Sequence, residues 1–203
     1  MAEPVRFYFD PICPWTYQTS RWARTLERLG EIELSWGLFS LEMQNAGEEP
    51  EELASSHARS ARALRTAVVA RDAGGEHAVG EFYAALGERV HGRGEPLEAP
   101  KTVEAALEDA GLEGVLSEKA WADPTTADRV AEDHRALSER TRSFGVPTIV
   151  LDGGEGPAIF GPVVSEVPTD EEAVELWRHV SWLVRYENFS ELKRDRTLAL
   201  DLA

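Results

Sequence analysis

The stretch from Val5 to Thr16 constrains this chain more than any other part of its sequence. Val5 to Phe9 is rich in aromatic and branched residues, which predicts a buried strand, and Asp10-Pro11 ends it. Cys13 follows, and Pro14 suits the first turn of a helix, where its missing N–H and fixed φ cost nothing. The helix is predicted to continue through Trp15, Trp22, Ala23, Leu26 and Leu29 and to end at Gly30. The only cysteine therefore lies where a strand passes into a helix.

Cys13 can be interpreted in two ways. A lone cysteine often serves only as a small apolar side chain in a turn. At a helix N-terminus, however, a thiol faces unpaired N–H groups and the positive end of the helix dipole, and both favour the thiolate. Pro14 and Trp15, together with the strand before them, favour this second interpretation. We therefore predict that Cys13 is a nucleophile whose pKa lies below the free value of about 8.5.

The overall charge argues against one class of partner. The 203 residues carry a formal net charge of −16, whereas nucleic-acid binding needs clustered Lys and Arg. No apolar run approaches the length of a membrane span, so no membrane association is expected. No signal peptide precedes the first strand, and a single cysteine cannot form an intramolecular disulfide. Both observations predict a cytoplasmic protein, since thiols are kept reduced there.

Strand and helix patterns divide the chain into three parts. Ile32 to Leu38 alternates like a strand that extends to about Leu41. Val146 to Leu151 and Ala158 to Phe160 are predicted to be strands joined by a glycine-rich turn. Between these parts the chain is predicted to be helical, with three apolar stripes: Val79, Phe82, Tyr83, Leu86 and Val90; Val103, Ala106, Leu107 and Ala110; and Ala127, Val130, Ala131, His134 and Leu137. Thr169 and Glu172 form a capping box in front of a last helix.

This order of elements predicts an α/β protein. Without the helical block it is a β-α-β half followed by a β-β-α half, as in a thioredoxin fold with one large insertion. We expect residues 1–45 and 145–203 to form a thioredoxin-like domain. Residues 46–144 would form an all-helical insertion subdomain, because the sheet must close across them.

A proline opens the third strand, at Val146-Pro147. Proline cannot donate to a central ladder, so it belongs at the first residue of a strand or at a sheet edge. A trans proline that merely starts the strand would satisfy this rule. In the thioredoxin fold, the proline at this place is cis and lies against the active-site cysteine. That resemblance implies a cis Val146–Pro147 bond, with Val146 offering its backbone to a bound peptide or thiol.

Several segments resemble DsbA-like thioredoxin-fold proteins, and most closely the mycothiol-dependent nitroreductase group of actinobacteria. They are Phe9 to Trp15, Thr19 to Trp22, Ser40-Leu41 with Asn45, Gly87 to His91, Phe160 to Ser165 and Glu191 to Arg194. The resemblance implies a thiol-dependent oxidoreductase with Cys13 as nucleophile. Its cofactor would be a low-molecular-weight thiol, mycothiol in this group, and its substrate a small or protein mixed disulfide. The histidines lack metal-ligand spacing, and one cysteine cannot form a structural zinc site, so no metal is expected. Whether the protein is a homodimer is left open.

The residues expected to contact the thiol or the substrate are Pro14, Trp15, Thr16, Asn45, His91, Val146 and Pro147. Trp15 is expected to be exposed and to stack on a substrate. Asn45 either hydrogen-bonds a ligand or is only a turn residue. His91 either belongs to the site or is a satisfied group on the apolar face of a helix.

Thr16 stands where redox-active relatives carry a second cysteine. A dithiol enzyme clears its mixed disulfide by attack from that second sulfur, so this chain would need a second molecule of external thiol. Alternatively, the Thr16 hydroxyl donates to the Cys13 thiolate and lowers its pKa. Two other functions stay open. One is a transferase or isomerase resembling kappa-class glutathione transferases, which activate a bound thiol and usually carry serine at the Cys13 position. The other is a non-catalytic binding protein of the same fold.

Overall fold

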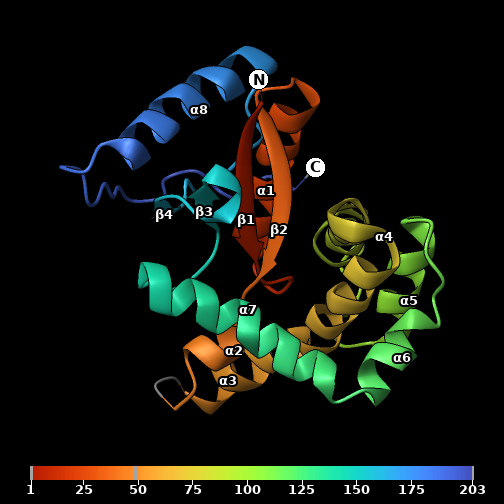
Figure 1. Ribbon diagram of the computed structural model, residues 1–203. Helices are drawn as coiled ribbons and strands as arrows, with labels where there is room; N and C mark the ends of the chain where they lie inside the picture. Colours follow the sequence, from red (N-terminus) through yellow and green to blue (C-terminus); the bar gives the residue numbers. More distant parts are fainter. Residues whose placement is uncertain (1, 48–49, 203) are drawn as a thin grey trace.

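The computed structural model describes residues 2–47 and 50–202, which build a four-stranded sheet in the order β2-β1-β3-β4 (Figure 1). The strands are β1 (Glu3–Phe9), β2 (Ile32–Leu38), β3 (Thr148–Leu151) and β4 (Ala158–Phe160). β1 pairs in parallel with β2 and antiparallel with β3, and β3 pairs antiparallel with β4. The β-α-β and β-β-α halves thus share one sheet. This is the predicted thioredoxin-like α/β fold.

Helices separate the two halves of the sheet in sequence. The helix α1 (Pro14–Arg28) joins β1 to β2, and α8 (Asp170–Arg185) follows β4. Between β2 and β3 lie α2 (Leu41–Gln44), α3 (Glu51–His57), η1 (Ala58–Ser60), α4 (Ala61–Gly87), η2 (Glu88–Gly92), α5 (Pro100–Asp109), α6 (Leu116–Ala122) and α7 (Thr125–Thr141), and η3 (Asp152–Gly154) lies in the β3–β4 turn. The long helical block follows the sequence prediction. Its limits as a subdomain stay a prediction.

The helices α1 and α8 pack against each other through two tryptophans. Trp22 is completely buried, and its indole N–H donates to the carbonyl of Ala173 at 3.2 Å. Its ring centroid lies 6.1 Å from that of Trp177. The predicted capping box is present at the start of α8, where Thr169 and Glu172 each bond the other's backbone N–H. α8 is thereby fixed at its N-terminus and along its apolar face.

The second strand is shorter than the sequence suggested. β2 ends at Leu38, and the predicted extension to Leu41 is wrong. Ser40 caps the short helix α2 instead, because its hydroxyl accepts a hydrogen bond from the Met43 N–H at 3.2 Å. The Leu41 N–H donates to the carboxylate of Asp10 at 2.8 Å. The chain therefore turns at Leu41 toward the end of β1.

The structure has a main apolar core and a smaller one beside the cysteine. The main core unites the sheet with α1, α4, α5 and α8 and includes Phe7, Trp22 and Phe82. The second apolar cluster consists of Tyr8, Phe39, Leu137, Val146 and Val150, and Cys13 packs against it. Residues from β1, the β2–α2 turn, α7 and β3 thus form the apolar surroundings of the thiol.

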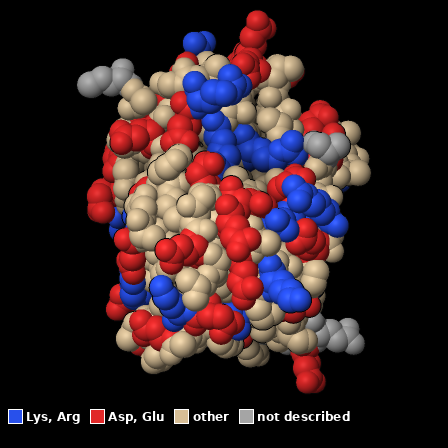
Figure 2. Space-filling model, turned by 90° about the vertical axis from the view of Figure 1, so that its right-hand side faces the viewer, with Lys and Arg blue, Asp and Glu red and all other residues tan. Residues whose placement is uncertain are grey.

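The molecular surface carries a strong excess of acidic side chains. In Figure 2, Asp and Glu are distributed from the top to the bottom of the face in view, and Lys and Arg lie among them, with the largest basic group in the upper half. This distribution fits the formal net charge of −16. Among residues 2–47 and 50–202, no helix has the length and hydrophobicity that a membrane crossing requires.

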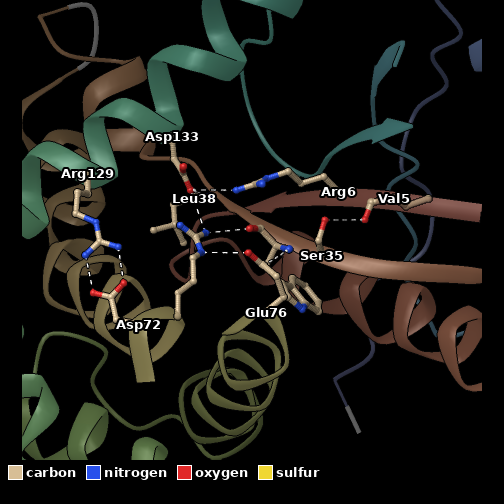
Figure 3. A network of polar contacts seen from close by, with 10 residues as sticks. Val5, Arg6, Ser35, Leu38, Asp72, Glu76, Arg129 and Asp133 are labelled. Carbon is tan, nitrogen blue, oxygen red and sulfur yellow. Dashed lines mark hydrogen bonds and ion pairs between the residues drawn. The ribbon is translucent and has the colours of Figure 1, made fainter. Parts of the chain in front are cut away.

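The outer edge of β2 is covered by side chains from the helical block (Figure 3). The Trp36 N–H donates to Glu76 at 2.8 Å, and the Trp36 carbonyl accepts from Arg71 at 2.9 Å. The Leu38 N–H donates to Asp133 at 3.1 Å. An edge strand offers free backbone N–H and C=O groups, and here these side chains satisfy them.

Ion pairs join the same side chains to one another. Asp133 on α7 lies 3.1 Å from Arg71 on α4 and 3.6 Å from Arg6 on β1. Arg71 in turn lies 3.3 Å from Glu76. We call Arg6, Arg71, Glu76 and Asp133 the edge network. It fastens two helices of the block to the sheet along β2.

Candidate active site

Cys13 is placed by a tight turn between β1 and α1. The turn closes when the Cys13 N–H donates to the carbonyl of Asp10 at 3.1 Å. Cys13 is the N-cap residue of α1 in an extended conformation, and Pro14 occupies the first helical position. The strand, the break and the helix start thus follow the sequence prediction. They bring the sulfur to the positive end of a 15-residue helix.

The thiol of Cys13 is half-buried, and burial is the largest influence on its ionisation. Burial raises the pKa of Cys13, and the nearby carboxylate of Asp10 raises it further. The Thr16 hydroxyl and the backbone N–H groups of Thr16 and Trp15 act in the opposite direction, because hydrogen-bond donors beside a sulfur favour its thiolate form. The net direction is upward. The predicted acidic thiol is therefore wrong: desolvation outweighs the donors at the helix start.

Asp10 is the site residue that the sequence analysis missed, since it was assigned only as a strand breaker. Its side chain is completely buried and accepts hydrogen bonds from the N–H groups of Ile12 at 3.1 Å and Leu41 at 2.8 Å. Burial nevertheless raises the pKa of this carboxyl to about 6. Asp10 thus changes its charge in a pH range close to neutrality, three residues before the cysteine.

Substituting Asp10 by asparagine is expected to make Cys13 more reactive at pH 7. At this pH the Asp10 carboxyl, with a pKa of about 6, is mostly ionised, and its negative charge disfavours the thiolate. Removing that charge lowers the pKa of Cys13 and enlarges the thiolate fraction. The intrinsic nucleophilicity falls with the pKa, so the net gain is about threefold per unit of pKa. The measurement is the rate of Cys13 alkylation by iodoacetamide from pH 5 to 10. A slower variant would mean that Asp10 assists the nucleophile as a base.

Two further hydroxyl groups lie close to the sulfur. Thr16 is completely buried, and its hydroxyl has no hydrogen-bond partner of normal geometry within the described residues. Its proximity nevertheless lowers the pKa of Cys13, an effect that the sequence analysis gave as one alternative. Tyr83 on α4 is also buried, and its ring stacks on Phe9 with centroids 3.9 Å apart. Burial first, and then Cys13, raise the pKa of Tyr83 well above its usual value, so its hydroxyl stays protonated.

His91 holds the turn that carries the cysteine. Its Nε2 lies 2.9 Å from the carbonyl oxygen of Pro11, so Nε2 carries the proton and donates it. Burial lowers the pKa of His91, which keeps the ring neutral in this role. The ring also lies beside Tyr17, with centroids 5.4 Å apart. His91 belongs to a single π-helical turn, η2. Its contact with the site is the hydrogen bond to the backbone of Pro11.

The strand that follows the helical block begins at a cis-proline. The Val146–Pro147 bond is cis, as the resemblance implied, and Val146 belongs to the second apolar cluster beside Cys13. The Pro147 carbonyl accepts a hydrogen bond from the Gly161 N–H at 2.8 Å. Gly161–Pro162 is a second cis bond, which the sequence analysis did not predict. Two proline loops therefore lie next to each other at this end of the sheet.

Trp15 differs from its expected state, whereas Asn45 fits one of the two alternatives predicted for it. Trp15 is half-buried rather than freely exposed, since the guanidinium of Arg196 lies 4.7 Å from its ring centroid. Asn45 ends α2, and its side-chain amide donates to the Leu41 carbonyl at 2.8 Å. This contact fits the alternative of a turn residue. A role of Asn45 in binding stays a prediction.

Metal-ligand clusters and surface hollows can be compared with the position of Cys13. Among residues 2–47 and 50–202, no group of three or more His, Cys, Asp or Glu side chains could hold a metal ion. Two surface hollows of about 440 and 500 Å³ lie between α1 and α8 and beside the end of α8, and neither is lined by Cys13 or its neighbours. His134, which the sequence placed on an apolar helix stripe, is buried and accepts a hydrogen bond from the Ser40 N–H at 3.4 Å.

A cysteine at the start of the first helix, a cis-proline before the third strand and a helical insertion define the DsbA-like class of thioredoxin folds. Solved structures that share this fold include the following three. A 2-hydroxychromene-2-carboxylate isomerase has a TM-score of 0.62 and 19% sequence identity, and the match covers 89% of this chain and 96% of that one. The cytosolic disulfide reductase DsbM from Pseudomonas aeruginosa with GSH has a TM-score of 0.59 and 15% identity, over 88% of this chain and 99% of that one. A probable DsbA oxidoreductase, SCO1869, from Streptomyces coelicolor has a TM-score of 0.56 and 19% identity, over 96% of this chain and 94% of that one.

Sequence similarity identifies the family. Residues 12–194 match the Rv2466c-like family, described as mycothiol-dependent nitroreductase Rv2466c. A relative from Mycobacterium tuberculosis, the uncharacterized protein Rv2286c, is 34% identical over 198 residues, which cover 96% of this chain and 83% of that protein. The chain belongs to the Rv2466c-like family.

Proposed function

We propose that this protein is a cytoplasmic thiol-dependent oxidoreductase that acts through Cys13 alone. The observation that carries the proposal is the position of the sulfur at the N-cap of α1, half-buried and next to the cis-proline strand. The chain has only one cysteine, so a mixed disulfide on Cys13 has no internal sulfur to resolve it. The family description points to mycothiol as the external thiol. The GSH-containing DsbM structure shows that a protein of this fold takes a small thiol.

The proposed reaction has two exchange steps. The Cys13 thiolate attacks the mycothiol sulfur of a small or protein mixed disulfide, the substrate S–S bond breaks, and the substrate leaves as a thiolate that takes up a proton. A second mycothiol thiolate then attacks the mycothiol sulfur bound to Cys13, which releases mycothiol disulfide and regenerates the Cys13 thiolate. The net reaction converts one mixed disulfide and one mycothiol into one free substrate thiol and one mycothiol disulfide.

Each of the residues around Cys13 has its own role in this proposal. Thr16 and the first N–H groups of α1 stabilise the thiolate, while Asp10 responds to pH near neutrality. His91 fixes the turn through Pro11. Pro14 sets the helix start, Trp15 and Asn45 contact the bound molecule, and Val146 offers its backbone at the cis-proline, Pro147.

A second candidate function follows from the raised pKa of Cys13. A thiol that stays largely protonated at neutral pH is a weak nucleophile, and such a site could instead activate a bound thiol cofactor. The fold shared with a 2-hydroxychromene-2-carboxylate isomerase fits an isomerase or transferase of this kind. In that case Cys13 would bind the cofactor thiol without forming a disulfide with it.

Mass spectrometry of the intact protein tests the proposal. Wild type is expected to gain the mass of one mycothiol less two hydrogens when incubated with mycothiol disulfide and to lose it again when reduced mycothiol is added. Cys13→Ser should show no gain, because the only sulfur nucleophile is gone. Glutathione disulfide serves as the control for cofactor identity, and equal labelling by both disulfides would overturn the assignment to mycothiol. A wild type that forms no adduct would favour the isomerase or transferase. An adduct that reduced mycothiol does not release would favour a binding protein.

A further inference from the structure

The C-terminal segment returns to the start of α1. After α8 the chain continues without helix or strand through residues 187–202 and runs back toward α1 (Figure 1). The Asp201 N–H donates to the Ser165 carbonyl at 2.8 Å, and the same carbonyl lies 3.4 Å from the side-chain amide of Gln18. Ser165 therefore connects the end of the chain to the first turns of α1.

Within this segment, Arg196 reaches the active-site tryptophan. Its guanidinium carbon lies 4.7 Å from the ring centroid of Trp15, which is a cation–π contact. Arg196 is exposed, and it has no carboxylate partner among the described residues. Trp15 is the second residue after Cys13. The unneutralised guanidinium of Arg196 thus lies against Trp15, a residue in the first turn of the helix that follows Cys13.

The charge of the rest of the protein makes this cation distinctive. With a formal net charge of −16, the protein repels anions at long range. Many of its arginines are neutralised by acidic neighbours, as Arg89 is by Asp109 at 2.8 Å and Arg129 by Asp72 at 2.6 Å. The C-terminal segment carries Lys193, Arg194 and Arg196, with Asp195 between the two arginines, and no ion pair neutralises Arg196 among the described residues.

The position of Arg196 favours an effect on the bound molecule over an effect on the sulfur. The charged group with the largest effect on the pKa of Cys13 is Asp10. Arg196 contacts the indole of Trp15, which is the surface on which a substrate beside Cys13 would lie. A guanidinium in this place offers N–H donors and a positive charge that match a carboxylate or a phosphate.

We propose that Arg196 is a specificity-determining residue that selects disulfide substrates with an anionic group close to the reacting sulfur. The inference rests on the proposed function, in which Cys13 attacks a disulfide. The anion pairs with Arg196 while the rest of the substrate lies against Trp15. The Cys13 thiolate then forms the new S–S bond, the substrate S–S bond breaks, and the departing thiolate carries away the electron pair.

Two aromatic disulfides of different charge test this inference. The second-order rate of Cys13 is measured with dianionic 5,5′-dithiobis(2-nitrobenzoate) and with neutral 4,4′-dithiodipyridine, at low and at high salt. In Arg196→Ala, the rate with the dianion should fall about fivefold, whereas the rate with the neutral reagent should stay within about twofold. High salt should reduce the difference between wild type and Arg196→Ala in the rate with the dianion, because the charge of an exposed arginine is screened.

Two further variants separate charge from structure. Arg196→Lys should keep most of the preference, since it retains the cation. Lys119→Ala on α6 makes the same change in net charge at another exposed position, and it should leave both rates unchanged. A loss of rate in Arg196→Ala that is equal for the two reagents would overturn the inference, because it would mean that Arg196 only covers Trp15. A wild type that reacts with neither reagent would overturn the proposed function itself.

Discussion

Replacing Thr16 by cysteine is expected to turn the protein into a dithiol reductase. The natural chain needs an external thiol to clear Cys13, whereas Thr16→Cys supplies a second sulfur within the site. Positions three apart on a helix place their Cβ atoms about 5–6 Å apart, and a disulfide needs about 4 Å, so a modest adjustment closes the bond. Thr16 is completely buried next to Cys13, and the new sulfur would occupy the place of its hydroxyl.

The expected gain is large because the resolving step becomes intramolecular. Well-placed internal groups have effective concentrations far above the millimolar level of a cellular thiol. Reduction of a protein disulfide such as insulin, driven by dithiothreitol, should therefore rise by about 100-fold or more in Thr16→Cys. The matched controls are Thr16→Ser, which keeps the hydroxyl, and the double variant Cys13→Ser/Thr16→Cys, which lacks the nucleophile. Should mass spectrometry of Thr16→Cys find no disulfide between Cys13 and the introduced sulfur, the placement of Thr16 against Cys13 would be wrong.

Removing Asp133 is expected to produce a large loss of stability for a partly exposed position. Its carboxylate accepts a hydrogen bond from the Leu38 N–H and pairs with Arg71 and Arg6. Asp133→Ala leaves a strand N–H and two half-buried guanidinium groups without their shared acceptor. Their side chains are still 21–25% exposed, so water replaces part of the loss. We expect a decrease in the free energy of unfolding of about 3 kcal/mol.

Urea unfolding measures this effect, and the helix itself provides the control. Glu132→Ala changes the same charge on the same helix, but at an exposed position, and it should cost less than about 0.5 kcal/mol. Asp133→Asn should lie between the two, because its amide oxygen can still accept from Leu38. Hydrogen exchange at the Leu38 amide should accelerate in Asp133→Ala. Equal stability of Asp133→Ala and Glu132→Ala would show that the edge network does not fasten the helical block.

Local sequence signals predicted the elements that form the site, and long-range contacts explain what those signals missed. The strand, the Asp10-Pro11 break, the Cys13 N-cap and Pro14 follow one another in sequence, so local rules were sufficient to find them. The buried state of Asp10 depends on the N–H of Leu41, which lies beyond β2. The raised pKa of Cys13 likewise depends on a cluster assembled from four separate elements. Helix-end rules describe only the donors near a thiol and not its burial.

Arg196 illustrates the same limit at the other end of the chain. It contacts Trp15 from a segment without helix or strand. The two residues are far apart in the sequence, so no local sequence pattern indicates that they meet. The match of Glu191 to Arg194 with family sequences indicated only that the C-terminal segment belongs to the family. The edge network was missed for a related reason: its members lie on β1, α4 and α7, and in the sequence each resembles an ordinary surface charge.

The covered edge of β2 also determines how much of this protein can be removed. A shortened variant without residues 46–144 would retain every strand of the sheet, yet it would lack Arg71, Glu76 and Asp133. The backbone groups of Trp36 and Leu38 would then face water along an open edge. Unprotected edges of this kind pair with one another, so such a variant is prone to aggregate. The helical block thus protects the sheet against self-association, besides any part it has in catalysis.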